Sequence, residues 1–89
     1  MATVQFAKAF RRHVPCPDER LDGSSLRDVL DAYFAMHPGV RGYVLDELGA
    51  LRRHINVFVN STQCDDRVLL SDHIDATDSV HVFQALSGG

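Results

Sequence analysis

Apolar and polar residues alternate in three stretches of the chain: residues 3–7, residues 53–59 and residues 80–83. A period of two is typical of a β-strand with one face on the hydrophobic core and the other toward solvent. We therefore predict a strand in each stretch, and we expect the first to continue toward Phe10. The residues expected on the core side are Val4, Phe6, Ile55, Val57, Val59, Val80 and Val82.

The clearest helix is predicted for residues 25–36. Ser25 and Asp28 approximate a capping box, in which side chains satisfy the free N–H groups of the first helical turn. Proline cannot continue a helix, so Pro38 is expected to end it at His37. Apolar residues recur at helical spacing and form one stripe: Leu26, Val29, Leu30, Tyr33 and Phe34.

Weaker signals predict the connecting segments. After a proline-rich turn, residues 19–21 are expected to form a short strand in a hairpin with the first strand. We interpret residues 40–51 as a connection containing a helical turn at 43–48, which Gly49 ends. Residues 68–70 are interpreted as a short edge strand. The residues expected to cover the edge of the core in the 40–51 connection are Tyr43, Val44, Leu45 and Leu48.

One helix over one face of a small mixed sheet is an α+β architecture. The first and last strands carry strong β signals, so we expect them to lie side by side, parallel, in the centre of the sheet. This order of elements predicts a β-grasp, ubiquitin-like fold, with residues 1–89 as a single domain and residues 86–89 as a tail. The helix is expected to pack on the apolar side of the sheet.

Two phenylalanines are out of phase with the core residues of their strands. Phe58 and Phe83 are predicted to lie on the sheet face opposite the helix, together with His81. Exposed aromatic residues on a small protein often mark an interface. We therefore predict that Phe58, His81 and Phe83 form a partner-binding face.

Composition and charge exclude several classes of function. The 89 residues have a formal net charge of −3, which gives no reason to expect binding to nucleic acid or to a membrane surface. No apolar run approaches the roughly 20 residues needed to span a bilayer, and the first residues lack a signal-peptide pattern. We expect a cytoplasmic protein in which Cys16 and Cys64 are free thiols.

No motif for metal or nucleotide binding is present. The five histidines lack the spacing of zinc ligands, so we predict no metal site. The chain has neither of the glycine-rich loops that hold phosphate groups, so we predict that it binds no cofactor. If the chain takes part in ATP-dependent chemistry, another protein must bind the ATP.

The chain ends Leu86-Ser87-Gly88-Gly89. Glycine has no Cβ, so this backbone can enter a slot that is too narrow for a side chain. Four extended residues reach roughly 13 Å beyond the last strand. The Gly89 carboxylate is a nucleophile toward a phosphoryl group, so it could be converted to an acyl-adenylate. Leu86, Ser87 and Gly88 would thread it into the active site of a partner.

These features resemble the MoaD/ThiS sulfur carriers over nearly the whole chain, with the connection at residues 40–51 most similar to CysO-type carriers. The matching segments are the opening Val4-x-Phe6 strand, the run His54-Ile55-Asn56-Val57-Phe58-Val59-Asn60, the turn Asp78-Ser79-Val80 and the terminal Ala85-Leu86-Ser87-Gly88-Gly89. The family often has glycine where this chain has Thr77, so the turn there is expected to differ in type if the position needs a positive φ. Leu86-Ser87 likewise replaces a proline-containing form found in several members.

The resemblance implies a carrier and not a catalyst. A ubiquitin-activating-type adenylyltransferase would use ATP to adenylate Gly89. A sulfur donor of the rhodanese or cysteine desulfurase type would then convert the adenylate into a thiocarboxylate. The thiocarboxylate would supply sulfur to an accepting synthase in a biosynthetic pathway.

Three other functions remain compatible with the sequence. The chain could be the small subunit of a molybdopterin synthase, which would form a stable hetero-tetramer. It could be a ubiquitin-like modifier joined to lysines of target proteins; Lys8, its only lysine, would then be a site of self-conjugation besides the N-terminus. It could also be an interaction module whose tail has no role.

Overall fold

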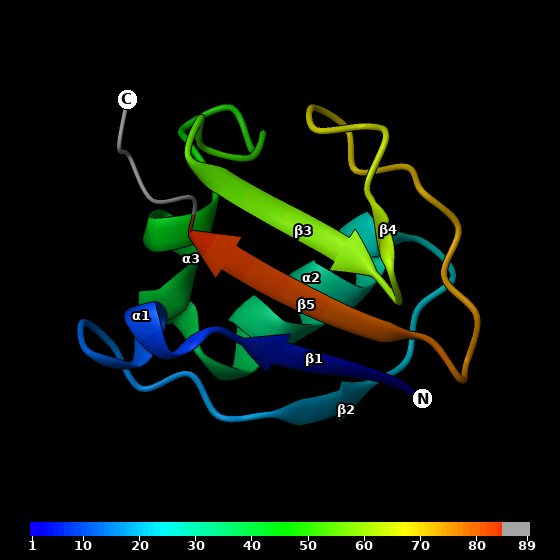
Figure 1. Cartoon of the computed structure of the whole chain (residues 1–89), viewed down its shortest axis with the longest axis horizontal. Coiled ribbons are helices and arrows are strands. Elements are labelled where there is room, and N and C mark those ends of the chain that lie inside the picture. The colour runs from blue at the N-terminus through cyan, green and yellow to red at the C-terminus, as the bar shows by residue number, and fades with distance from the viewer. Residues whose placement is uncertain (85–89) are drawn as a thin grey trace.

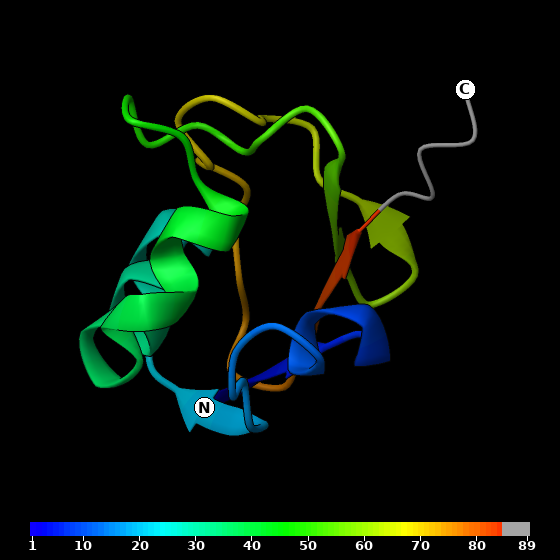
Figure 2. The same cartoon turned by 90° about the vertical axis from the view of Figure 1, so that its left-hand side faces the viewer.

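The computed structural model describes residues 1–84, which form a five-stranded mixed sheet with the two longer helices on one side (Figures 1 and 2). The strand order is β2-β1-β5-β3-β4. This arrangement is the β-grasp fold that the sequence predicts. The elements are β1 (Ala2–Phe6), α1 (Lys8–Arg11), β2 (Glu19–Leu21), α2 (Leu26–Met36), α3 (Pro38–Val44), β3 (Ile55–Val59), β4 (Thr62–Gln63) and β5 (Ser79–Gln84).

The two terminal strands lie in the middle of the sheet. β1 and β5 are parallel, with Val4 opposite Val80, whereas β3 pairs with β5 in the antiparallel direction. The weak strand β2 pairs antiparallel with β1. The predicted parallel pair and the predicted hairpin are therefore both confirmed.

The core lies between the sheet and α2. All five stripe residues of the helix are buried, and so are the predicted core residues of the strands except Val59, which is half-buried. The Ser25 hydroxyl accepts a hydrogen bond from the Asp28 backbone N–H at 3.1 Å, so the N-cap forms as predicted. At the other end, the His37 backbone N–H donates to the Tyr33 carbonyl at 2.9 Å and closes the last turn.

The prediction that the first strand continues toward Phe10 is wrong. β1 ends at Phe6, and the chain turns into the four-residue helix α1. The turn returns the Phe10 ring to the core, where its centroid lies 5.3 Å from the Phe6 ring in an edge-to-face arrangement. Burial of this aromatic side chain outweighs its preference for a strand.

The helical turn predicted at residues 43–48 lies earlier in the chain, at Pro38–Val44. Proline ends α2, but its fixed φ and missing N–H also suit the first position of a new helix, so Pro38 begins α3. Residues 46–49 form a turn in which Gly49 has φ +84°. Of the four residues expected to cover the core, Val44 and Leu45 are buried, whereas Tyr43 is 46% and Leu48 93% exposed.

Residues 68–70 form a turn and not the predicted edge strand, because the Asp66 carboxylate organises the local backbone. It accepts hydrogen bonds from the backbone N–H groups of Val68 and Leu69 and, at 2.6 Å, from the Ser71 hydroxyl. These bonds stabilise the ionised form and lower the pKa of Asp66 to about 2. The edge strand is instead β4, at Thr62–Gln63.

We expect the Asp66 turn to make stability depend on acid pH. The folded pKa lies below the ordinary value of 3.8, so the contribution of the carboxylate is complete above that value and is lost as the pH falls through about 2. Asp66→Asn should therefore lower the melting temperature at neutral pH. The gap in melting temperature between the variant and the wild type should shrink as the pH falls from about 5 to about 2. Thermal unfolding followed by circular dichroism measures this. Asp31→Asn, at an exposed position of α2, is the control. A melting-temperature difference between Asp66→Asn and the wild type that does not change with pH would contradict the lowered pKa of Asp66.

The remaining turns need no positive φ at Thr77. Within residues 1–84 the non-glycine residues with positive φ are Asn60 and Leu70. The Asp78 carboxylate closes the turn by accepting from the Asp75 backbone N–H at 2.8 Å. Threonine therefore fits this position without backbone strain.

Both cysteines are buried, and they are free thiols as predicted. Burial raises the pKa of the Cys16 thiol and of the Cys64 thiol. A raised pKa lowers the fraction of reactive thiolate at neutral pH. Among the helices in residues 1–84, none has the length and apolar character needed to cross a membrane.

Candidate partner-binding site

Phe58, His81 and Phe83 lie together on the sheet face opposite α2, and we call them the aromatic cluster. Phe58 on β3 pairs in register with His81 on β5. The Phe58 and Phe83 ring centroids are 5.6 Å apart and edge-to-face, and the His81 ring stacks on Phe83 at 6.2 Å. Phe83 is 42% exposed and Phe58 is half-buried. The predicted position of all three residues on the outer face is therefore confirmed.

The aromatic cluster lines a shallow hollow of about 480 Å³, to which Asn60 also contributes. Asn60 follows β3 with φ 56°, and its side-chain amide bonds to Asp78 and to the Ser79 backbone N–H. The side chain is thus held at one edge of the hollow. No Asp, Glu, Lys or Arg side chain of residues 1–84 lines this hollow, so it suits an apolar side chain of a partner.

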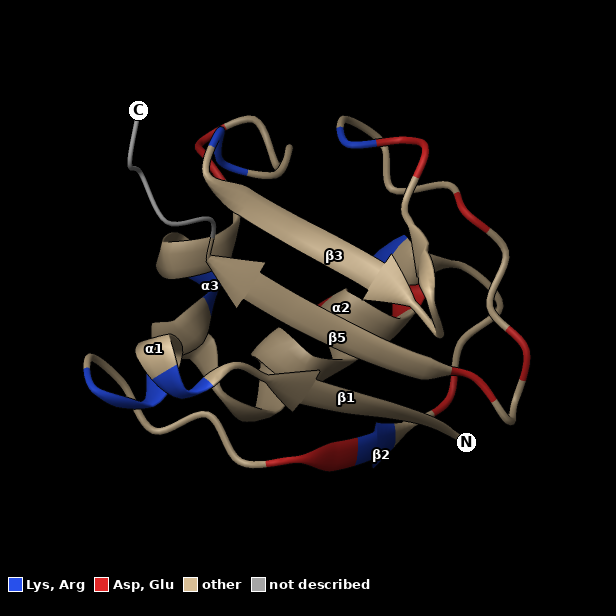
Figure 3. Ribbon diagram, viewed as in Figure 1, with Lys and Arg blue, Asp and Glu red and all other residues tan. Residues whose placement is uncertain are grey.

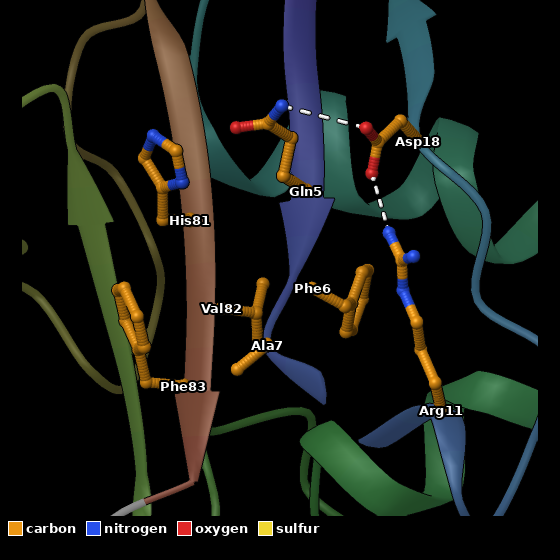
Figure 4. A pocket seen from close by; sticks show the side chains of 8 residues that line it. All are labelled: Gln5, Phe6, Ala7, Arg11, Asp18, His81, Val82 and Phe83. Atoms are coloured by element: carbon orange, nitrogen blue, oxygen red, sulfur yellow. Dashed lines mark hydrogen bonds and ion pairs between the residues drawn. The ribbon is translucent and has the colours of Figure 1, made fainter. Parts of the chain in front are cut away.

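A second hollow adjoins the first, because His81 and Phe83 line both (Figure 4). Its far wall is polar: Arg11 donates to the Asp18 carboxylate at 3.0 Å, and the Gln5 amide donates to the other Asp18 oxygen at 3.4 Å. The outer face therefore has an apolar centre beside a polar flank, as protein interfaces commonly do.

β5 contains His81 and Phe83 of the aromatic cluster and ends one residue later, at Gln84. Gln84, the last described residue, lies beside a groove whose floor includes Phe10 and Ile55. Leu86, Ser87, Gly88 and Gly89 lie outside the described residues, so their predicted roles remain predictions. Phe83 precedes Gly89 by only six residues, so the aromatic cluster is close in sequence to the predicted reaction site.

Across residues 1–84 no three His, Cys, Asp or Glu side chains are grouped so as to hold an ion. The two His–carboxylate contacts, His37 with Glu19 and His73 with Asp75, are pairs at 2.7 Å.

The family model described as the ThiS family matches residues 9–89. The chain belongs to the ThiS family. The match begins within α1 and includes β2, β3, β4 and β5, and it extends through the terminal Gly88-Gly89 pair. It bears out the resemblance to the MoaD/ThiS carriers that the motifs of the sequence indicate.

Solved structures agree with this assignment. CysO from Mycobacterium tuberculosis is 25% identical with a TM-score of 0.82, covering 97% of this chain and 100% of that protein. SAMP1 from Haloferax volcanii is 25% identical with a TM-score of 0.78, covering 99% and 98%. A chain from the Amycolatopsis orientalis BexX/CysO complex is 22% identical with a TM-score of 0.82, covering 100% of both chains. No curated protein matches this ThiS-family chain.

The fold and the family together make the chain a ubiquitin-like protein of the sulfur carrier or modifier kind. Sequence reasoning placed the aromatic cluster but missed two features around it. Asn60 was not recognised as a wall of the hollow, although an asparagine directly after a strand is a common turn signal. The groove beside Gln84 depends on α1, whose only sequence signal is the apolar Phe10 next to a basic run.

Proposed function

We propose that the protein is a sulfur carrier whose functional C-terminus is Gly89. The observation that carries the proposal is the ThiS-family match, which extends to Gly89 and includes the Gly-Gly pair. A ubiquitin-activating-type adenylyltransferase acts on the tail, and this chain is its substrate. The chain contributes the reacting carboxylate and the surface that positions it, and the partner supplies bound ATP.

The chemistry has two stages. The Gly89 carboxylate attacks the α-phosphorus of ATP and displaces pyrophosphate, which gives an acyl-adenylate. A persulfide of the rhodanese or cysteine desulfurase type then attacks the acyl carbon and AMP leaves. A second thiol cleaves the resulting disulfide, so the sulfur stays on Gly89 as a thiocarboxylate and the donor becomes oxidised to a disulfide. A sulfur-accepting synthase consumes the product.

The aromatic cluster is the proposed contact with the adenylyltransferase. Its hollow has room for apolar side chains, and aromatic residues dominate the energy of many interfaces. A partner that binds Phe83 fixes the start of a six-residue segment, which limits where the Gly89 carboxylate can reach. Such positioning lowers the entropy cost of the reaction.

Phe58→Ala should weaken this contact and leave the fold intact. Phe58 lies on the outer face, so its truncation removes little apolar area from the core. We expect the half-saturation concentration of the carrier in ATP–pyrophosphate exchange to rise by about tenfold or more, with a smaller change in the maximal rate. Arg20→Ala on β2 is the control for an exposed residue away from the cluster. A Phe58→Ala protein that melts at a much lower temperature, or that exchanges like the wild type, would contradict this role.

The proposed function is tested by ATP–pyrophosphate exchange with purified components. The adenylyltransferase should incorporate labelled pyrophosphate into ATP only when the full-length carrier is present. Exchange that proceeds equally without the carrier, or that does not occur at all, would overturn the proposal.

A ubiquitin-like modifier is the second candidate. The likeness to SAMP1, a small archaeal modifier protein, favours it. The two functions share the adenylate and differ in the nucleophile that attacks it: a persulfide for a carrier, a lysine amine for a modifier. Mass spectrometry of tryptic peptides distinguishes them, because conjugation leaves a tail remnant in isopeptide linkage on target lysines.

A further inference from the structure

Basic residues gather at one end of the molecule, whereas acidic residues predominate over the rest of it (Figure 3). Residues 7–18 and 37–54 contain six of the nine Lys and Arg residues but only three of the twelve Asp and Glu residues. Residues 19–36 and 55–84 contain the other three basic and nine acidic residues. A chain with a net charge of −3 thus combines one end of about +3 with a remainder of about −6.

The basic residues surround the place where β5 leaves the sheet. α1, α3 and the segment before β3 meet there, as Figures 1 and 3 show. We call this region the basic end; its cations are Lys8, Arg11, Arg12, Arg41, Arg52 and Arg53, all exposed. A groove of about 230 Å³ lies within it, lined by His13, Tyr43, Arg52, His54 and Gln84.

Several cations of the basic end have no partner among residues 1–84. The side chains of Arg12, Arg41 and Arg53 make no hydrogen bond or ion pair there. Arg52 donates through Nε to the Gly42 carbonyl at 2.7 Å, which leaves its two terminal nitrogens without a bond inside the described chain. A guanidinium held in this way can receive a carboxylate through two parallel hydrogen bonds.

The acidic residues of the same end compete weakly for these cations. The Asp18 carboxylate binds Arg11, and one Asp46 oxygen accepts from the backbone N–H groups of Leu48 and Ala50. Glu47 is exposed. Most of the positive charge is therefore available to a second molecule.

We infer that the basic end docks on an acidic surface of the adenylyltransferase, around the opening through which the tail enters. The inference rests on the proposed function. The occupant is a protein surface that carries Asp and Glu side chains, one of which fits the groove beside Arg52. The aromatic cluster supplies the apolar contact and the basic end supplies orientation, so that the tail points toward the bound ATP.

The use of arginine fits this role. Five of the six cations are arginines, whose guanidinium stays protonated and is a poor nucleophile at neutral pH. An activated acyl group at the end of the tail would react with a lysine amine held nearby. The five arginines therefore add positive charge to the basic end without adding an amine that could accept the acyl group, and Lys8 is the one amine among the six cations.

Charge complementarity mainly accelerates association, and salt screens it. We expect the association rate of the carrier with the purified adenylyltransferase, measured by stopped-flow fluorescence, to fall by about tenfold between about 20 mM and about 300 mM salt. Arg12→Glu and Arg53→Glu should each slow association severalfold at low salt and approach the wild-type rate at high salt. Arg20→Glu is the matched control, because it changes the net charge equally at an exposed position of β2 outside the basic end.

The outcomes separate this inference from the proposed function. If adenylation of Gly89 proceeds, two results would overturn the inference alone. One is that Arg20→Glu slows association as much as the other two variants, and the other is an association rate that does not fall with salt. Absence of both binding and adenylation at every salt concentration would overturn the inference and the proposed function together. Circular dichroism of each variant verifies that it is folded.

Discussion

Deletion of Gly89 alone is expected to abolish adenylation while leaving the affinity for the adenylyltransferase nearly unchanged. The shortened chain still ends in a carboxylate, but that carboxylate is withdrawn by one residue, roughly 3.3 Å along an extended tail. In-line attack on a phosphorus atom needs closer placement than this, so the reaction stops. The binding surface consists of residues that the deletion does not touch. Pyrophosphate exchange measures the reaction, and isothermal titration calorimetry measures the affinity.

The matched control is Arg20→Ala in the full-length chain, which should react like the wild type. Exchange that continues without Gly89 would show that another group is adenylated. Loss of binding together with loss of exchange would show that the tail, and not the folded domain, holds the partner.

Val57→Asp is expected to unfold the domain. The Val57 side chain is fully buried in the hydrophobic core, and Val57 on β3 pairs with Val82 on β5. An unpaired carboxylate there costs several kcal/mol, and the total stability of a small domain is only about 5–15 kcal/mol. We expect loss of the cooperative thermal transition in circular dichroism.

Asn56→Asp provides the control on the same strand. Asn56 is the adjacent residue on the opposite face, and its side-chain oxygen accepts hydrogen bonds from Gln63 and from the Arg67 guanidinium, both at 3.1 Å. A carboxylate at this position gains a cationic partner, so the variant should fold. Val57→Asp melting like Asn56→Asp would contradict the assignment of Val57 to the core.

The regular elements were predictable because each follows a single local rule. Val4 with Phe6 and Val80 with Val82 alternate in and out of the core, and the α2 stripe follows the helical period. Elements that depend on tertiary packing were not predictable in this way. α1 forms because Phe10 packs on Phe6, and an apolar Phe10 next to a basic run does not by itself predict this contact.

Proline and aspartate account for the other differences. Pro38 both ends α2 and begins α3, and only the first of these roles was inferred. Residues 68–70 are apolar enough to suggest a strand, but the Asp66 carboxylate holds their backbone in a turn. Side-chain hydrogen bonds to nearby N–H groups commonly compete with regular structure in this manner.

The candidate site likewise has one part that the sequence predicts and another part that only the fold reveals. Phe58, His81 and Phe83 lie where the period of two in their strands places them, so sequence alone located the aromatic cluster. The groove and the basic end assemble residues from α1, α3 and the segment before β3. Their basic residues are visible in the sequence, but only the fold brings them to the end where β5 leaves the sheet.

The measurement that tests the central proposal most directly is the intact mass of the protein after incubation with ATP, the adenylyltransferase and a persulfide donor. Replacement of one Gly89 oxygen by sulfur should raise the mass by the difference between a sulfur atom and an oxygen atom. Fragmentation should place this change on the last residue. The chain lacking Gly89 should keep its mass. An unchanged mass for the full-length chain, or the addition of a whole sulfur atom at Cys16 or Cys64, would contradict the proposal.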